Sequence, residues 1–359
     1  MLLITVWPFI LALAISAFAI PIIIRVADAK HLMDEPDSDR KFHSHRTPTL
    51  GGVAIFAGTV ISFSAMIDYI GANYDIKFMV PAFLLLFFTG IKDDILNMPA
   101  VKKLMIQFIA AALLTVFGTM RLTNLWGMLG ITDISPVVGM ALTFILIVAL
   151  INAFNLIDGV DGLAGGLGFI ASMFFGSWFA LTNSQALSIL SFSLAGALLG
   201  FLFFNIHKAK IFMGDTGSML IGFVISILVI KFIENNRLPG IEQSPYYIKA
   251  APGVAVAAVM IPLFDMSRVF FQRIIKKRSP FKADRNHIHH MLIDLKLSTT
   301  ATTLFLYVMA IALIVLSLFL KELRSMELLI VLIVIVSFVN LAVILIRRKK
   351  QNLSGTLNV

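Results

Sequence analysis

Long apolar stretches, separated by short polar segments, follow one another along almost the whole chain. About 20 apolar residues cross a bilayer as a helix, so the pattern predicts an all-α integral membrane protein with about eleven transmembrane helices. The stretches that meet or approach this length are residues 3–24, 50–67, 77–91, 104–118, 137–152, 163–181, 186–204, 218–233, 252–267, 300–320 and 328–346.

The first stretch resembles a secretory signal peptide in one respect, because Ala17-Phe18-Ala19 is similar to a cleavage site. However, no Lys or Arg precedes it, and the apolar run continues to Ile24. A secretory signal begins with a basic segment. We therefore predict that this stretch is a retained transmembrane span.

The composition supports a membrane protein without a separate soluble domain. Of the 359 residues, 59% are hydrophobic, and the mean hydropathy is +0.94, whereas soluble domains are roughly 45–50% apolar. Residues 268–299 form the longest segment between stretches. The sequence thus predicts one polytopic transmembrane domain over residues 1–346, followed by a short polar tail at 347–359. The absence of cysteine excludes disulfides and thiolate metal sites.

The basic residues indicate the orientation. With the N-terminus outside, most of the 29 Lys and Arg residues fall in segments on the inner side, as the positive-inside rule requires. We therefore predict that the N-terminus is outside and the C-terminus cytoplasmic. The net charge of +9 is then explained by topology and anionic lipid, without nucleic acid as a partner.

Five polar clusters follow odd-numbered apolar stretches, so alternate crossing would place all five on the cytoplasmic face. A transporter, the alternative from another class, more often carries ionisable groups near the bilayer midplane. The pattern favours chemistry at the inner membrane surface. The clusters are Lys41/His43, Asp93/Asp94, Asp158/Asp161, Asp215 and His287/His289/His290.

Two of the clusters contain a pair of acids. The neighbouring carboxylates of Asp93 and Asp94 repel unless a cation lies near, although a solvated helix end is the simpler alternative. In Asn155–Gly162, residues three apart share one helix face and present Asn155, Asp158 and Asp161 together. This segment lacks the further ligands of an EF-hand, and its glycines would also suit close helix packing.

Two further segments suit phosphate. Glycines and hydroxyls around Asp215, in Phe212–Ser218, favour phosphate at a helix N-terminus and a hard cation on the carboxylate, but they also form an ordinary capping sequence. Arg285 and the three histidines are potential donors to a phosphate or sugar, with zinc as the alternative ligand.

Between these segments, residues 265–278 form an amphipathic stretch, which either extends the ninth span or lies on the headgroups. Pro262 is a potential kink in the ninth span.

Taken in order, the strings Arg40–Gly52, Asp93–Asn97, Asn155–Gly162, Phe212–Ser218 and Ser279–His290 resemble the polyprenyl-phosphate N-acetylhexosamine-1-phosphate transferases. His-Ile-His-His, preceded by Ser-Pro-Phe, is similar to the undecaprenyl-phosphate GlcNAc-1-phosphate transferase branch. The resemblance covers roughly residues 20–300. Asn97 departs from it, because many relatives have Asp there, so this position is not expected to be essential.

The resemblance implies a reaction at the bacterial inner membrane, with the active site facing the cytoplasm. GlcNAc 1-phosphate would pass from UDP-GlcNAc to undecaprenyl phosphate, giving undecaprenyl-diphosphate-GlcNAc and UMP, as the initiating membrane step of a cell-envelope glycan. Another UDP-N-acetylhexosamine or UDP-MurNAc-pentapeptide would be the alternative donor. Membrane lipids are expected partners, and a homodimer is left open.

The resemblance also implies roles for residues, with Mg²⁺ as the cofactor and Mn²⁺ as its alternative. We expect direct attack by the lipid phosphate, with Asp94 orienting or deprotonating it; an aspartyl-phosphate intermediate is the alternative. The implied catalytic residues are Asp93, Asp94 and Asp215, with Asp215 and Asp94 as metal ligands; Asn155, Asp158, Asp161 and Phe212 bind the nucleotide; Arg285, His287, His289 and His290 bind the diphosphate and sugar; and Lys41, His43 and Lys103 bind the lipid phosphate.

Overall fold

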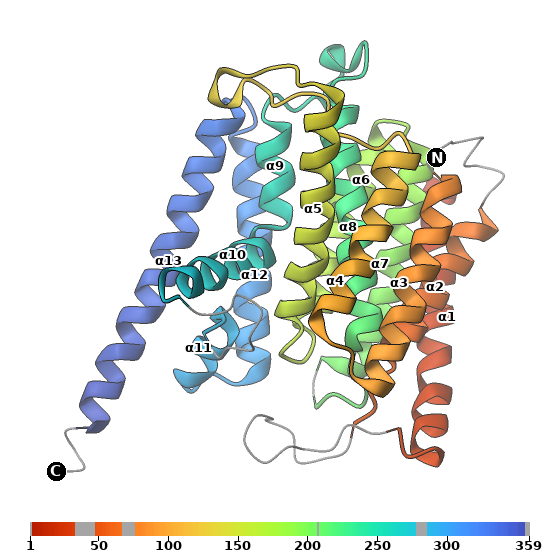
Figure 1. The fold of residues 1–359 in the computed structure, drawn as a ribbon, viewed down its shortest axis with the longest axis vertical. Coiled ribbons are helices and arrows are strands. Elements are labelled where there is room, and N and C mark those ends of the chain that lie inside the picture. Colours follow the sequence, from red (N-terminus) through yellow and green to blue (C-terminus); the bar gives the residue numbers. More distant parts are fainter. Residues whose placement is uncertain (1, 33–46, 67–75, 207, 278–285, 356–359) are drawn as a thin grey trace.

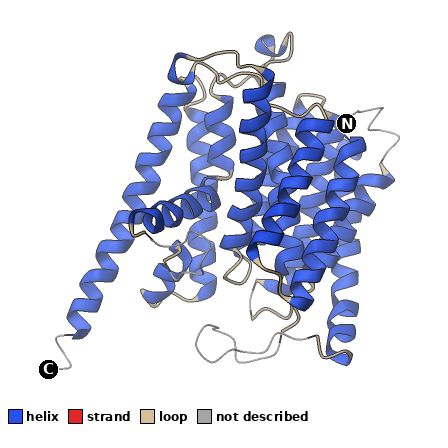
Figure 2. Ribbon diagram, in the orientation of Figure 1, coloured by secondary structure: helices blue, strands red, loops and turns tan. Residues whose placement is uncertain are grey.

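The structure is a computed structural model that describes residues 2–32, 47–66, 76–206, 208–277 and 286–355. Within these ranges the regular structure is helical and contains no strand (Figure 2). The predicted all-α class is therefore confirmed. Lys41, His43 and Arg285, which the sequence singled out, lie outside the described residues.

The elements follow one another in a simple order. They are α1 (Leu2–Ala29), α2 (Gly51–Ala65), α3 (Ile76–Leu96), α4 (Ala100–Ala112) with its π-helical continuation (Leu113–Phe117), a 3₁₀ turn (Met128–Gly130), α5 (Pro136–Ile157), α6 (Leu163–Leu181), α7 (Gln185–Asn205), α8 (Gly214–Asn235), a 3₁₀ turn (Ile241–Gln243), α9 (Ala251–Ala258), α10 (Met260–Ile275), α11 (Ile288–Asp294), α12 (Thr299–Phe319) and α13 (Ser325–Gly355).

Each predicted apolar stretch coincides with a helix or a helix pair. In the described part of the chain, 8 helices are long and apolar enough to cross a membrane, and α9 with α10 would make up to 9. The stretches at 50–67 and 77–91 form α2, a shorter apolar helix, and α3, which carries charges near both ends. The chain is thus a multi-pass membrane protein, and the number of crossings stays a prediction.

The ninth apolar stretch does not form one straight helix. α9 and α10 are bent by 82° relative to each other at Val259. Pro262 lacks the N–H that would donate to the Ala258 carbonyl, so the helix breaks where this hydrogen bond is missing. The amphipathic α10 therefore does not extend α9 but crosses below it (Figure 1).

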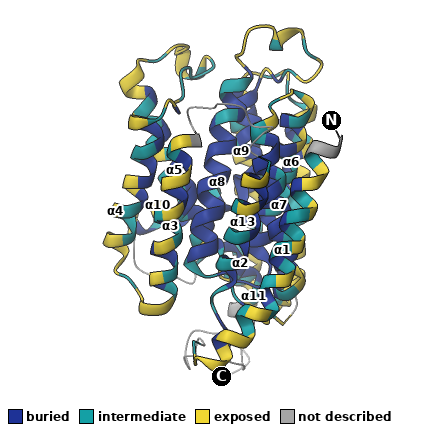
Figure 3. Ribbon diagram, turned by 90° about the vertical axis from the view of Figure 1, so that its right-hand side faces the viewer, coloured by how far each residue is buried: buried dark blue, intermediate teal, exposed yellow. Residues whose placement is uncertain are grey.

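α8 lies at the centre of the bundle and is almost completely buried (Figure 3). It packs against α5, α3, α2 and α6. Small residues allow this close approach: a Cβ on Gly52 of α2 would lie 2.2 Å from the Gly217 nitrogen, and one on Gly90 of α3 would lie 2.3 Å from Thr216 Cα. Membrane helices commonly approach one another through such residues. The first turn of α8 is therefore held tightly by two neighbouring helices.

The helices alternate in direction, so that the C-terminal ends of α3, α5 and α7, the start of α8 and the short α11 lie at one end of the bundle (Figure 1). At the opposite end, the segment between α4 and α5 is attached to the end of α8. There the Glu234 carboxylate accepts hydrogen bonds from the Thr123 backbone nitrogen at 3.0 Å and the Thr123 hydroxyl at 2.6 Å.

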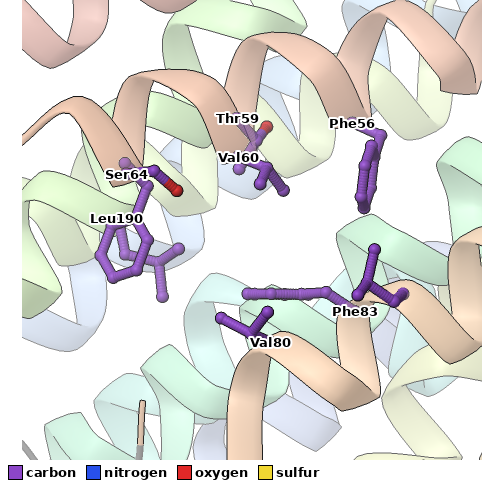
Figure 4. Close-up of a pocket in the computed structure, with 9 residues that line it drawn as sticks. Phe56, Thr59, Val60, Ser64, Val80, Phe83 and Leu190 are labelled. Atoms are coloured by element: carbon purple, nitrogen blue, oxygen red, sulfur yellow. The ribbon is translucent and has the colours of Figure 1, made fainter. Parts of the chain in front are cut away.

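A small cavity of about 30 Å³ lies among α2, α3 and α7 and is shown in Figure 4. Phe56, Val60, Val80, Phe83 and Leu190 contribute most of its wall, and no charged side chain lines it. An apolar void of this size stays dry or holds at most a water molecule. It is a packing feature of the apolar interior, and the candidate chemistry lies elsewhere.

Candidate active site

Lys103 joins two acids that are far apart in sequence. Its ammonium lies 2.5 Å from Asp93 Oδ2 at the end of α3 and 2.6 Å from Asp215 Oδ2 in the first turn of α8. Asp93 is buried, and its other oxygen accepts a hydrogen bond of 2.5 Å from the Met98 nitrogen. Lys103, predicted to hold the lipid phosphate, thus lies between two candidate catalytic carboxylates.

Asp94 faces the start of α8. Its Oδ1 accepts a hydrogen bond of 2.6 Å from the Asp215 nitrogen, and its Oδ2 accepts bonds from the Thr216 hydroxyl at 2.6 Å and the Thr216 nitrogen at 3.2 Å. These are donors that a helix N-terminus leaves without partners inside the helix. Asp94 therefore caps α8 from a neighbouring helix and fixes the backbone that carries Asp215.

The three acids form a candidate cation site. Asp93, Asp94 and Asp215 each offer a carboxylate oxygen, and these oxygens all lie within 4.8 Å of one another. A cavity of about 490 Å³ opens beside them, lined also by Thr49 and Asn97. Clustered carboxylate oxygens suit hard cations such as Mg²⁺ and Mn²⁺. The donor set therefore fits the predicted metal.

Asn155 and Asp158 lie beside this cluster, at the end of α5. The Asn155 side-chain amide donates a 3.0 Å hydrogen bond to the Ser218 hydroxyl of α8. Burial, together with the negative charges of Asp215, Asp94 and Asp161, raises the pKa of Asp158 to about 8. Three of these causes are neighbouring carboxylates, so the site concentrates negative charge, which a bound cation would offset.

Asp161 is engaged with the protein itself. Its Oδ2 accepts a hydrogen bond of 3.1 Å from the Ala209 nitrogen, and its carbonyl accepts one of 3.0 Å from the Thr303 hydroxyl of α12. The side chain is buried. Asp161 thus holds the segment between α7 and α8, and its predicted role in binding the nucleotide stays a prediction.

Phe212 joins the starts of two helices through its backbone. Its nitrogen donates to the Pro48 carbonyl at 2.8 Å, and its carbonyl accepts from the Gly51 nitrogen at 2.9 Å. Gly214 follows with φ of +70° and would carry a Cβ only 2.6 Å from the Asp94 carboxylate. This left-handed conformation favours glycine. The predicted role of Phe212 in binding the nucleotide stays a prediction.

The histidine motif contacts the Asp158 loop. A Cβ on Gly159 would lie 2.8 Å from His289 Nε2, so the imidazole lies directly against this glycine. Burial and the neighbouring His290 together lower the pKa of His289 to about 3. His289 is therefore neutral at physiological pH. The ring of His290 lies 4.3 Å from that of His289, measured between centroids.

The structure adds Asp265 and Arg268, which the sequence did not predict as site residues. The Asp265 carboxylate lies 2.8 Å from His287 Nδ1 and 2.9 Å from a terminal nitrogen of Arg268. One signal was available, because an acid in a predominantly apolar stretch is costly and commonly functional. Its partners could not be found from spacing alone, since His287 lies 22 residues further along.

Comparison with known proteins identifies the family. Residues 76–233 match the family described as Glycosyl transferase family 4. Over 303 residues the chain is 35% identical to the probable undecaprenyl-phosphate N-acetylglucosaminyl 1-phosphate transferase of Bacillus subtilis (strain 168), an alignment that covers 83% of this chain and 80% of the relative. The chain belongs to the polyprenyl-phosphate N-acetylhexosamine-1-phosphate transferase family.

Two more members of this transferase family are similar over a comparable length. The undecaprenyl-phosphate alpha-N-acetylglucosaminyl 1-phosphate transferase of Escherichia coli (strain K12) is 30% identical over 275 residues, 75% of this chain and 71% of the relative. The decaprenyl-phosphate N-acetylglucosaminephosphotransferase of Mycobacterium tuberculosis (strain CDC 1551 / Oshkosh) is 31% identical over 296 residues, with the same shares. Membership confirms the predicted family and does not support the transporter alternative.

Proposed function

We propose that this transferase moves GlcNAc 1-phosphate from UDP-GlcNAc to undecaprenyl phosphate, giving undecaprenyl-diphosphate-GlcNAc and UMP. The similarity to relatives that carry this activity in their names supports the proposal. The observation that carries it is the convergence of Asp93, Asp94 and Asp215 around Lys103 at one end of the bundle. Such a site can bring two phosphate groups together.

The reaction needs no net proton transfer. A lipid-phosphate oxygen attacks the phosphorus that bears the sugar, a new P–O–P bond forms, and the bond to the UMP oxygen breaks. A phosphate monoester has a second pKa of about 6, so the nucleophile is already largely dianionic near neutral pH. The protein therefore has to offset repulsion and orient the two anions rather than supply a strong base.

Asp215 and Asp94 would hold Mg²⁺, as the resemblance implies, and Asp93 lies within reach of the same ion. The bound ion would offset the charge of the diphosphate and of the departing UMP. Lys103 supplies a positive charge from the protein itself, 2.5 and 2.6 Å from two of these acids. Once a cation shares these carboxylates, the lysine can donate to the lipid phosphate, as its predicted role requires.

The sugar nucleotide would lie toward α5 and α11. Asn155 and Asp158 follow one another along the end of α5, and His289 lies against Gly159 in the same loop. Because His289 is neutral, it can act as a hydrogen-bond donor or acceptor to the sugar or diphosphate without adding charge. This arrangement supports a nucleotide on the α5–α11 side of the acid cluster, with the lipid phosphate bound at Lys103.

The proposal is tested with purified protein, several UDP-sugars and undecaprenyl phosphate, in Mg²⁺ or in EDTA. We expect transfer from UDP-GlcNAc that EDTA abolishes and added Mg²⁺ restores. The Asp215→Asn variant should lose transfer by about 100-fold or more, since the ion that stabilises the reacting phosphates would lose a carboxylate ligand. Asp133→Asn, an exposed acid at the opposite end of the bundle, is the control.

Four outcomes would contradict all or part of this proposal. Transfer that persists in EDTA would overturn the metal assignment, and near-normal transfer by Asp215→Asn would overturn its role as a ligand. Preference for another UDP-N-acetylhexosamine would overturn the choice of sugar but keep the reaction class. No transfer with any UDP-sugar would overturn the function itself.

A further inference from the structure

Asp265 is a buried acid that the proposed reaction does not use. Asp265 is only 2% exposed, although it belongs to the amphipathic α10. The carboxylate accepts three hydrogen bonds: Oδ1 from Arg268 and from the Ile288 nitrogen, both at 2.9 Å, and Oδ2 from His287 Nδ1 at 2.8 Å. A buried charge is tolerated when it is paired and hydrogen-bonded in this way.

These contacts connect α10 to the start of α11. Arg268 also donates to the Asn286 carbonyl, so both Asp265 and Arg268 hold the segment that leads into the histidine motif. An ionised carboxylate can only accept hydrogen bonds, so His287 must carry a proton on Nδ1. Asp265 therefore fixes the ring orientation of His287 and the position of its Nδ1 proton, as carboxylates do for functional histidines elsewhere.

The contacts of His287 continue toward the side of the site where the sugar nucleotide is proposed to bind. The rings of His287 and His289 lie 5.7 Å apart between centroids and are inclined by only 6°. His289 is 1% exposed and lies against Gly159, in the loop that carries Asp158. A chain of contacts thus runs from Asp265 through His287 and α11 to the loop at the end of α5.

We propose that Asp265 is a positioning residue, which orients His287 and α11 so that the histidine motif closes against the Asp158 loop and binds the UDP-sugar. This inference rests on the proposed function and deepens it. It assigns UDP-sugar binding, rather than lipid binding, to α11 and its histidines. Asp265 itself does not touch the substrate.

Asp265→Asn is the informative substitution. Its remaining oxygen can still accept from Arg268 and Ile288, whereas its amide nitrogen would replace Oδ2 and donate to His287 Nδ1. The connection is kept, but the proton on His287 has to move. We expect the KM for UDP-GlcNAc to rise about tenfold, the effect typical of losing a residue that orients a functional histidine, and the KM for undecaprenyl phosphate to stay within about twofold.

Asp294→Asn is the matched control. Asp294 belongs to α11 as well and forms an ion pair of 2.6 Å with Arg347, away from Gly159. Its replacement should leave both KM values unchanged. Hydrogen–deuterium exchange of the full protein gives a readout that does not depend on activity: Asp265→Ala should increase exchange of peptides covering 286–294 severalfold, while peptides of α6 and α7 keep their protection and report an intact bundle.

An equal rise of both KM values in Asp265→Asn would overturn the inference, because it would indicate general damage. An unchanged KM for UDP-GlcNAc would overturn it too, as would unchanged exchange over 286–294 in Asp265→Ala. If the wild-type protein transfers no sugar phosphate at all, the proposed function fails. The exchange experiment then still decides whether Asp265 positions α11.

Discussion

The two neighbouring acids at the end of α3 have different tasks. Asp93 shares the Lys103 ammonium with Asp215, whereas Asp94 caps α8. The lysine thus provides a counter-charge within the acid cluster, in the region where a divalent cation would share the same oxygens. Lys103 and such a cation would therefore compete for the carboxylates, while both would favour the approach of a phosphate.

Replacing Lys103 by Ala should separate these two effects. We expect turnover to fall by about 100-fold, since a positive charge near the reacting phosphates is lost. The acids should at the same time bind Mn²⁺ more tightly, because the competing ammonium is gone, and this can be followed by paramagnetic resonance of the free ion. Lys102→Ala, the exposed neighbour on α4, is the control and should change neither quantity. Weaker Mn²⁺ binding by Lys103→Ala would contradict the competition.

The sequence predicted which residues belong to the site better than it predicted which of them contact one another. Asp93, Asp94, Asp158, Asp215 and His289 do gather at one end of the bundle, as predicted. However, Lys103 and Asp215 are 112 residues apart, and Asp94 and the Asp215 nitrogen 121. Such pairings depend on how helices pack, and no local spacing reveals them.

At the scale of the elements, the position of α8 depends on the small residues that face it. Gly90 of α3 lies three and four residues before the acid pair, and Gly52 of α2 faces Gly217. Because backbones rather than side chains meet here, the separation between Asp215 and the acids of α3 is set by the absence of a Cβ. The close packing of α3 against α8 therefore determines the geometry of the acid cluster.

Gly90→Ala should test this dependence. The new Cβ would lie 2.3 Å from Thr216 Cα, a backbone atom, so α3 and α8 must move apart. We expect a loss of stability of about 1–3 kcal/mol, as for overpacked interiors, visible as a lower unfolding temperature in detergent, together with reduced turnover. Thr89→Ala is the control, because that hydroxyl bonds only the Leu85 carbonyl of its own helix. Unchanged turnover in Gly90→Ala would contradict the close contact.

The apolar stretches predicted where helices occur, but they did not reveal the break between α9 and α10. Residues 252–267 are apolar enough to suggest one span, and the hydropathy pattern contains no sign of the 82° bend. Pro262 was the only local signal, and a proline is compatible with either a mild kink or a complete break. Contacts decide the outcome: Asp265 is held by His287 and Ile288, which requires α10 to cross the bundle near α11.

At the scale of the whole molecule, the orientation in the membrane links the fold to the chemistry. The lipid substrate keeps its chain in hydrocarbon and the nucleotide sugar is soluble, so the reacting groups have to meet at one interface. The acid cluster and α11 lie at the end of the bundle where α13, the last helix, ends (Figure 1). The distribution of Lys and Arg predicts that this end is cytoplasmic.

Single cysteines can test this orientation directly, because the chain contains none. Leu96, at the end of α3 beside the acid cluster, is 68% exposed, and Leu129, in the segment at the opposite end, is 80% exposed. We expect a membrane-impermeant maleimide to label Leu129→Cys in intact cells and Leu96→Cys only after permeabilisation. Retained transfer activity of both variants would show that labelling reports the native fold. Labelling of Leu96→Cys in intact cells would place the acid cluster outside, away from cytoplasmic UDP-sugars, and the proposed reaction could not then proceed as described.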